Sequence, residues 1–183
     1  MRISEYFPGT HQVPTMPGTT GPTFGTRLFD ASVAVGLASL LVTAVYVLRG
    51  AVDDPRRFAT VSGVGYALVC FGTYAVPRYL LDAFVAGVFT APFLVWVLVF
   101  VLPVLAAQGG VPAYLYADRG SVGALGGLFL ATIATIWYHL ALGGESDVLV
   151  LYPAVLPAIA AVLIAGAIAV EVGARATVDT IVG

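Results

Sequence analysis

The chain has no lysine, a single cysteine and few charges. Charged residues make up 10% of the 183 positions, whereas a soluble globular domain carries about 25%. The eight basic residues are all arginine, they are scattered, and the net charge is −2, which argues against a nucleic-acid partner. With Cys70 alone, no disulfide can form within the chain. The spacings of zinc sites, G-x-S-x-G, H-E-x-x-H and the P-loop are also missing, so no metal site or catalytic residue is predicted.

What the chain does contain is long apolar runs. Hydrophobic residues make up 60% of the sequence and the mean hydropathy is +0.98. A helix needs about 20 apolar residues to cross the hydrocarbon core of a bilayer. The sequence therefore predicts an all-α, multi-pass protein of the cell (plasma) membrane, with a bundle of five transmembrane helices within residues 27–175. The five runs without Asp, Glu or Arg are Ala31–Leu48, Phe58–Pro77, Ala83–Ala107, Gly120–Gly144 and Val148–Val170.

Both ends are predicted to lie outside the bundle. Residues 1–26 are rich in proline, glycine and threonine, which disfavours a helix, and they lack the apolar stretch of a cleavable signal peptide. Two interpretations are open for this N-terminal arm: a disordered tail, or an extended segment lying along the bundle or a partner. Residues 176–183 are predicted to form a short tail.

The ends of the helices follow from turn residues and charges. Pro55 after Asp54 predicts a helix start, and the same helix is expected to end near Pro77. The third helix is expected to be kinked by its prolines. Residues 108–119, with adjacent glycines and Pro112, are expected to form the longest internal loop. Glu171 and Arg175 are expected to terminate the fifth helix.

The arginines predict how the bundle is oriented. With five helices, the turn after the first helix, the loop after the third and the C-terminal tail share one side. That side holds five arginines and the other holds three. The positive-inside rule therefore predicts an N-terminus outside and a C-terminus in the cytoplasm.

Ionisable groups inside a membrane usually mark function, and here few are available. Arg78 and Asp82 are four residues apart, so on a helix they would share a face. One interpretation is an ion pair that caps the third helix at the membrane surface. The other is a gate or counter-ion near the outer surface.

His139 is the only histidine within an expected helix, and it follows Trp137 and Tyr138. A bis-histidine haem within the chain would need a second histidine on a facing helix, and His11 lies in the N-terminal arm. The simplest interpretation is a group of interfacial aromatics with a polar neighbour. A haem or quinone site shared with a partner subunit stays open.

Small residues are frequent in the expected helices. Gly123 and Gly127 form a G-x-x-x-G motif, which lets helices approach closely within one chain or between subunits. We interpret the motif as a packing surface.

The segments Tyr46–Phe58, Arg78–Tyr79, Phe89–Pro92 and Ala117–Ser121 resemble parts of archaeal microbial rhodopsins. The resemblance implies an outside N-terminus and a pocket for a hydrophobic pigment. That family, however, holds retinal through a Schiff-base lysine on a seventh helix, and this chain has neither. Its Arg78 and Asp82 are also four apart, where the family's pair is three apart. Covalent retinal binding and light-driven pumping are therefore not expected, and any carotenoid or retinoid would be bound non-covalently.

Four functional hypotheses result. The preferred one is a non-enzymatic integral subunit of a larger membrane assembly, with other membrane proteins or further copies of the chain as partners. The others are a carrier or channel for a neutral or apolar solute, a retinal-free opsin-like protein, and a haem or quinone site completed by another subunit.

Overall fold

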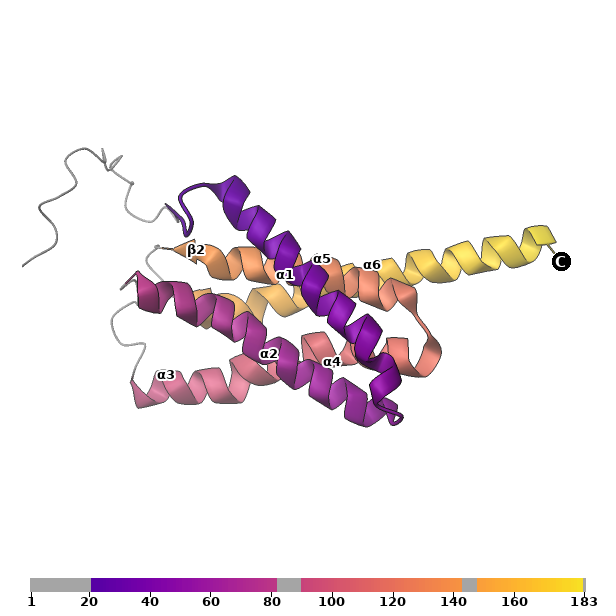
Figure 1. Cartoon of the computed structure of the whole chain (residues 1–183), viewed down its shortest axis with the longest axis horizontal. Helices are drawn as coiled ribbons and strands as arrows, with labels where there is room; N and C mark the ends of the chain where they lie inside the picture. Colours follow the sequence, from indigo (N-terminus) through magenta and orange to yellow (C-terminus); the bar gives the residue numbers. More distant parts are fainter. Residues whose placement is uncertain (1–20, 82–89, 143–147, 183) are drawn as a thin grey trace, which may run out of the picture.

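The computed structural model describes residues 21–81, 90–142 and 148–182. Within these residues, five helices are long and apolar enough to cross a membrane, which confirms the predicted all-α bundle. Figure 1 shows them lying side by side. Which end faces the cytoplasm stays a prediction. The elements are β1 (Gly21–Pro22), α1 (Arg27–Leu48), the 3-10 turn η2 (Arg49–Ala51), α2 (Pro55–Leu80), α3 (Ala91–Trp96), the π-helical turn η3 (Val97–Val101), α4 (Leu102–Arg119), α5 (Val122–Leu140), β2 (Ala141–Leu142) and α6 (Val148–Val182).

Local capping explains where the helices begin. The Thr26 side chain accepts a hydrogen bond from the backbone N–H of Phe29 at the start of α1. Asp54 does the same for Arg56 at the start of α2, where Pro55 occupies the first helical position as expected. The end of α2 lies at Leu80, three residues beyond the expected Pro77.

The third membrane-crossing helix is longer than expected, because α3, η3 and α4 form one continuous helix from Ala91 to Arg119. The distortion expected from proline takes the form of the π-helical turn η3, directly before Pro103. Proline lacks the N–H that would bond one turn back, which explains a widened turn at this place.

The predicted loop at residues 108–119 is wrong, since these residues belong to α4. Helix packing overrides the low helix propensity of the two glycines there. A Cβ added to Gly109 would lie 2.5 Å from Cβ of Tyr66, and one added to Gly110 would lie 3.0 Å from the carbonyl oxygen of Ala59. The glycines therefore allow α4 to lie almost in backbone contact with α2, on which it packs.

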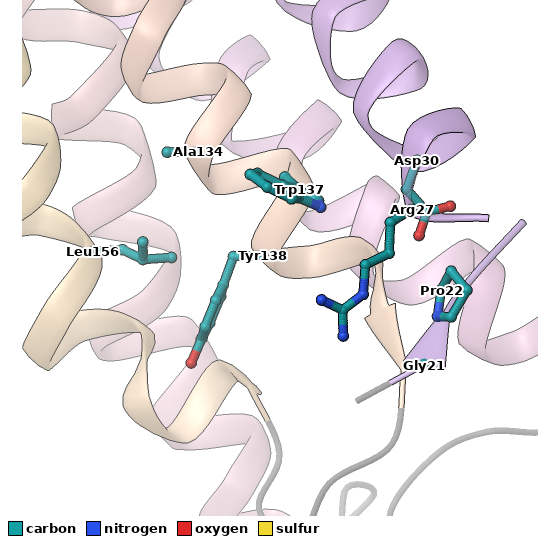
Figure 2. Close-up of a pocket in the computed structure, with 8 residues that line it drawn as sticks. All are labelled: Gly21, Pro22, Arg27, Asp30, Ala134, Trp137, Tyr138 and Leu156. Carbon is teal, nitrogen blue, oxygen red and sulfur yellow. The ribbon is translucent and has the colours of Figure 1, made fainter. Parts of the chain in front are cut away.

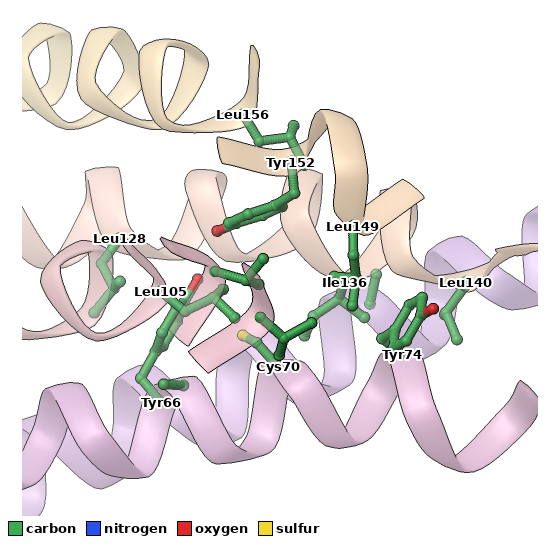
Figure 3. Close-up of a cluster of buried hydrophobic side chains, with 14 residues drawn as sticks. Tyr66, Cys70, Tyr74, Leu105, Leu128, Ile136, Leu140, Leu149, Tyr152 and Leu156 are labelled. Carbon is green, nitrogen blue, oxygen red and sulfur yellow. The ribbon is translucent and has the colours of Figure 1, made fainter. Parts of the chain in front are cut away.

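α5 is the central helix of the bundle. It contacts α1, α2, α4 and α6, and half of its most apolar stretch is buried, against 11% for those of α1 and α6. α1 and α6 therefore lie at the periphery. The buried cluster around α5 is drawn in Figure 3, with Tyr66, Cys70 and Tyr74 from α2, Leu105 from α4, Leu128, Ile136 and Leu140 from α5, and Leu149, Tyr152 and Leu156 from α6.

The last helix differs from the prediction at its end. Glu171 and Arg175 do not terminate it, because α6 continues to Val182. The two side chains are one turn apart and form an ion pair, which supports a helix rather than ending it. Figure 1 shows the final turns of α6 extending past the other helices.

Part of the N-terminal arm lies along the bundle. Gly21 and Pro22 pair with Leu142 and Ala141 as a short antiparallel bridge between β1 and β2. For these residues the structure favours the extended-arm interpretation over the disordered tail.

Gly123 and Gly127 face α6. A Cβ added to Gly127 would lie 2.5 Å from Cα of Ile164, whereas one added to Gly126 would meet nothing within 4 Å.

We expect Gly127→Ala to lower the free energy of unfolding by about 1–3 kcal/mol through overpacking. Gly126→Ala is the matched control and should be neutral or slightly stabilising. Denaturation of the purified protein in detergent measures both, and equal effects would contradict this packing.

Candidate functional site

The strongest polar feature of the interior is a cluster around Gln108, which is 7% exposed. Its amide nitrogen donates to the hydroxyl of Tyr66 over 2.8 Å and to that of Thr135 over 2.9 Å. Its amide oxygen accepts from the hydroxyl of Tyr152 over 2.8 Å. Both N–H groups and the carbonyl of this side chain are therefore used.

This Gln108 cluster joins four helices, since Tyr66 lies on α2, Gln108 on α4, Thr135 on α5 and Tyr152 on α6. All of its members are neutral amide or hydroxyl groups, so they hold the helices in register without a buried charge. A polar group in a hydrocarbon environment is costly unless it is hydrogen-bonded. The arrangement therefore supports specific assembly of the bundle more than chemistry on a substrate.

Sequence reasoning missed this cluster. Gln108 was assigned to the first position of a loop, and the two tyrosines were not singled out. The available signal was a lone glutamine in an otherwise apolar run, and it becomes visible once Gly109 and Gly110 are taken as helical.

His139 is fully buried next to the same cluster. Its Nδ1 lies 3.0 Å from the carbonyl oxygen of Cys70. A carbonyl only accepts, so Nδ1 carries the proton, and in the neutral imidazole Nε2 then carries the lone pair. Within the described part of the chain, Nε2 is buried without a hydrogen-bond partner. The rings of Tyr74 and Tyr152 pack on the imidazole, with centroids 6.1 and 5.3 Å away.

Trp137, Tyr138 and His139, which the haem or quinone hypothesis groups as contacts, point in different directions on α5. Consecutive helical residues point about 100° apart, and His139 turns into the core. Trp137 and Tyr138 instead line a cavity of about 320 Å³ at the end of the bundle. Haem iron bound to His139 would require the surrounding helices to part, because the imidazole is enclosed on all sides. Figure 2 shows the cavity with all of its lining residues: Gly21, Pro22, Arg27, Asp30, Ala134, Trp137, Tyr138 and Leu156.

Asp30 fixes the wall of this cavity. The carboxylate is 2% exposed, and its two oxygens accept backbone N–H groups of Thr23 and Phe24 over 2.9 and 3.0 Å. The Thr23 hydroxyl in turn donates to the carbonyl oxygen of Leu140. Asp30 therefore holds the last residues of the N-terminal arm against the end of α5.

Arg78 is buried at the end of α2. Its guanidinium donates to the carbonyl oxygens of Tyr74 over 3.1 Å and of His139 over 2.7 Å, and it lies 4.1 Å from the centroid of the Tyr74 ring. Arg78 thus joins the ends of α2 and α5. Asp82 lies outside the described residues, so the proposed pair stays a prediction.

Two further cavities are almost wholly apolar. One, of about 420 Å³, lies between α1 and α2 and reaches Tyr66. The other, of about 440 Å³, lies between α4 and α6 and reaches Gln108. The 2.8 Å hydrogen bond between Gln108 and Tyr66 stands between them.

Comparison of the chain with protein-family models, with curated proteins and with solved structures finds no match. Among residues 21–81, 90–142 and 148–182, no group of three or more His, Cys, Asp or Glu side chains is placed to hold a metal ion. The resemblance to microbial rhodopsins stays a prediction.

A double-mutant cycle tests the Gln108 cluster. We expect Tyr152→Phe to lower the free energy of unfolding by roughly 0.6 kcal/mol, and at most about 1.7, as for other hydrogen bonds between membrane helices. In a Gln108→Leu background the same substitution should cost nothing, because the acceptor is already gone. Tyr79→Phe, at a tyrosine that is 77% exposed, is the control. Equal costs of Tyr152→Phe in both backgrounds would contradict the assignment.

Proposed function

We propose that this protein is a non-enzymatic integral subunit of a membrane assembly. It receives a transmembrane helix of a different protein in the groove between α1 and α5. The main support is an open groove of about 400 Å³ between these helices, in which an added Cβ at Gly126 would meet nothing within 4 Å. It is lined by Val42, Thr43, Tyr46, Val122, Leu125, Gly126 and Phe129.

The outward face of α1 continues the groove. Ala34 and Ala38 are buried on the face of α1 that packs on α5. Beside the larger apolar side chains of Leu40 and Val47, the opposite face exposes small and hydroxyl-bearing residues at helical spacing. Lipid tails gain little from such residues, whereas membrane helices use them to approach one another closely. The α1 stripe consists of Ser32, Gly36, Ser39 and Thr43.

Glycines within the bundle show how closely two helices of this chain approach each other. Added Cβ atoms at Gly63, Gly109 and Gly127 would lie 2.5 Å from atoms of the neighbouring helix. At Gly36 and Gly126 an added Cβ would meet nothing within 4 Å. Gly36 in the α1 stripe and Gly126 in the groove therefore resemble the glycines of the internal contacts, but no neighbouring helix of this chain packs on them.

The shape of the surface favours a different protein over a second copy. A two-fold dimer built on this face would place groove against groove, and two concave surfaces leave a void between them. The α1 stripe spans residues 32–43, about 17 Å of helix at 1.5 Å per residue. One helix of a partner covers that length with three turns.

Purification from native membranes in mild detergent tests the proposal. We expect the tagged protein to elute with another membrane protein at fixed stoichiometry. Gly126→Leu should reduce the bound partner at least about tenfold, because the added side chain fills the groove between α1 and α5, with no change in melting temperature. Gly72→Leu, at an α2 glycine that is equally open, is the matched control. Elution of the chain alone or only as a homo-oligomer, or equal loss in both variants, would overturn the proposal.

A second candidate is a carrier for a neutral, mostly apolar solute. The two apolar cavities favour it, since they lie on either side of the hydrogen bond between Gln108 and Tyr66. Breaking the hydrogen bond between Gln108 and Tyr66 would remove a polar contact between the two cavities. Both side chains are neutral, which suits an uncharged solute.

Thermal unfolding with farnesol as a neutral probe tests the carrier. The melting temperature of the wild type should rise saturably with the probe, because a ligand that binds the folded state stabilises it. Gly65→Leu places a side chain in the α1–α2 cavity, where an added Cβ meets nothing within 4 Å, and should abolish the rise. Gly72→Leu should leave it intact. A flat melting temperature in the wild type would remove this candidate.

A further inference from the structure

We infer that the cavity beside Arg27 binds the phosphate group of an amphiphile, with the guanidinium of Arg27 holding the phosphate and Trp137 contacting the apolar part. This site is separate from the groove between α1 and α5 on which the proposed function rests.

The cavity presents a cation without a partner among the described residues. Figure 2 shows the side chains of Arg27 and Tyr138 pointing into the same space, with Trp137 and Asp30 on its wall. In the described parts of the chain, the two ion pairs within 4 Å are Arg119 with Asp118 and Arg175 with Glu171, and neither includes Arg27. The five N–H donors of a guanidinium form a fork that matches phosphate oxygens in pairs.

Asp30 is the one acidic side chain on the wall, and its geometry leaves Arg27 available. Each carboxylate oxygen already accepts a backbone N–H group, from Thr23 and Phe24. The same bonds anchor the short β1–β2 bridge that forms one side of the cavity. Asp30 therefore anchors one side of the cavity, and among the described residues it makes no ion pair with Arg27 within 4 Å.

The remaining wall is apolar and aromatic, and it comes from membrane-crossing helices. Ala134 and Trp137 lie on α5 and Leu156 on α6, and the Trp137 side chain is half exposed. Tryptophan and tyrosine favour the depth of lipid headgroups, where one end of the ring is apolar and the other is wet. The volume of about 320 Å³ suits a compact headgroup rather than a whole lipid. A phosphate on Arg27 would therefore place the rest of the amphiphile along α5 and α6.

Two sources of phosphate share this chemistry: a membrane lipid and free inorganic phosphate. The apolar wall favours the lipid, because an isolated phosphate would leave Trp137 and Leu156 unused. Binding experiments on the full-length protein in neutral detergent separate the two.

The probes are dihexanoyl-phosphatidylglycerol, dihexanoylglycerol, which lacks the phosphate, and inorganic phosphate. The readout is tryptophan emission in a Trp96→Phe background, where Trp137 is the only tryptophan. Native mass spectrometry of the wild-type chain with the same probes gives a second measurement that does not depend on that background. We expect saturable binding of the phosphatidylglycerol, weakened at least about tenfold in Arg27→Gln, since hydrogen bonds to charged groups are among the strongest.

Arg57→Gln is the matched control, because Arg57 is an exposed arginine at the start of α2, far from the cavity in sequence and outside its lining. It should bind the lipid as the wild type does. Equal weakening in both variants, equal binding of dihexanoylglycerol, or inorganic phosphate binding as tightly as the lipid would each overturn the inference. An unchanged affinity in Arg27→Gln would overturn it as well.

Discussion

In hydrocarbon, the amide of Gln108 has only protein groups to bond, and the packing of four helices follows from that constraint. Its three partners come from α2, α5 and α6, so the amide is satisfied only when these helices are in register with α4. The glycines that bring α2 against α4 lie one and two residues further along α4. The hydrogen bonds of Gln108 and the close helix contact at Gly109 and Gly110 therefore lie on the same turn of α4. Hydrophobic burial contributes little specificity here, because lipid tails are as apolar as the side chains.

The number of helices was predictable, because apolar runs long enough to span a bilayer are rare by chance and are separated here by charges. The limits of the third helix were not predictable by the same means. Glycine and proline near Gln108 indicate a loop in water, and only contact with Tyr66 and Ala59 of α2 shows why they are helical. The end of α6 is predicted too early for a related reason: Glu171 and Arg175 end the apolar run, but their i, i+4 spacing supports a further turn of helix.

The candidate sites were also predictable only in part from the sequence. Sequence alone identified Trp137, Tyr138 and His139 as neighbours, but their directions depend on how α5 is rotated in the bundle, which no local pattern encodes. Arg27 and Asp30 lie in the first turn of α1. Their role at a cavity depends on residues 21–24 returning to the end of α5, a contact across more than a hundred positions that periodicity cannot show.

The lengths of α5 and α6 have a mechanical consequence. At 1.5 Å per residue, the 19 residues of α5 span about 28 Å, close to the thickness of a bilayer core. The 35 residues of α6 span about 52 Å by the same rise. The two are tied where α5 begins, because the Glu171 carboxylate accepts hydrogen bonds from Ser121 and from the backbone N–H of Gly123. Tilting of the overhanging α6 is one way to accommodate a hydrophobic mismatch, and the Glu171 contacts would transmit such a tilt to the first turn of the central helix.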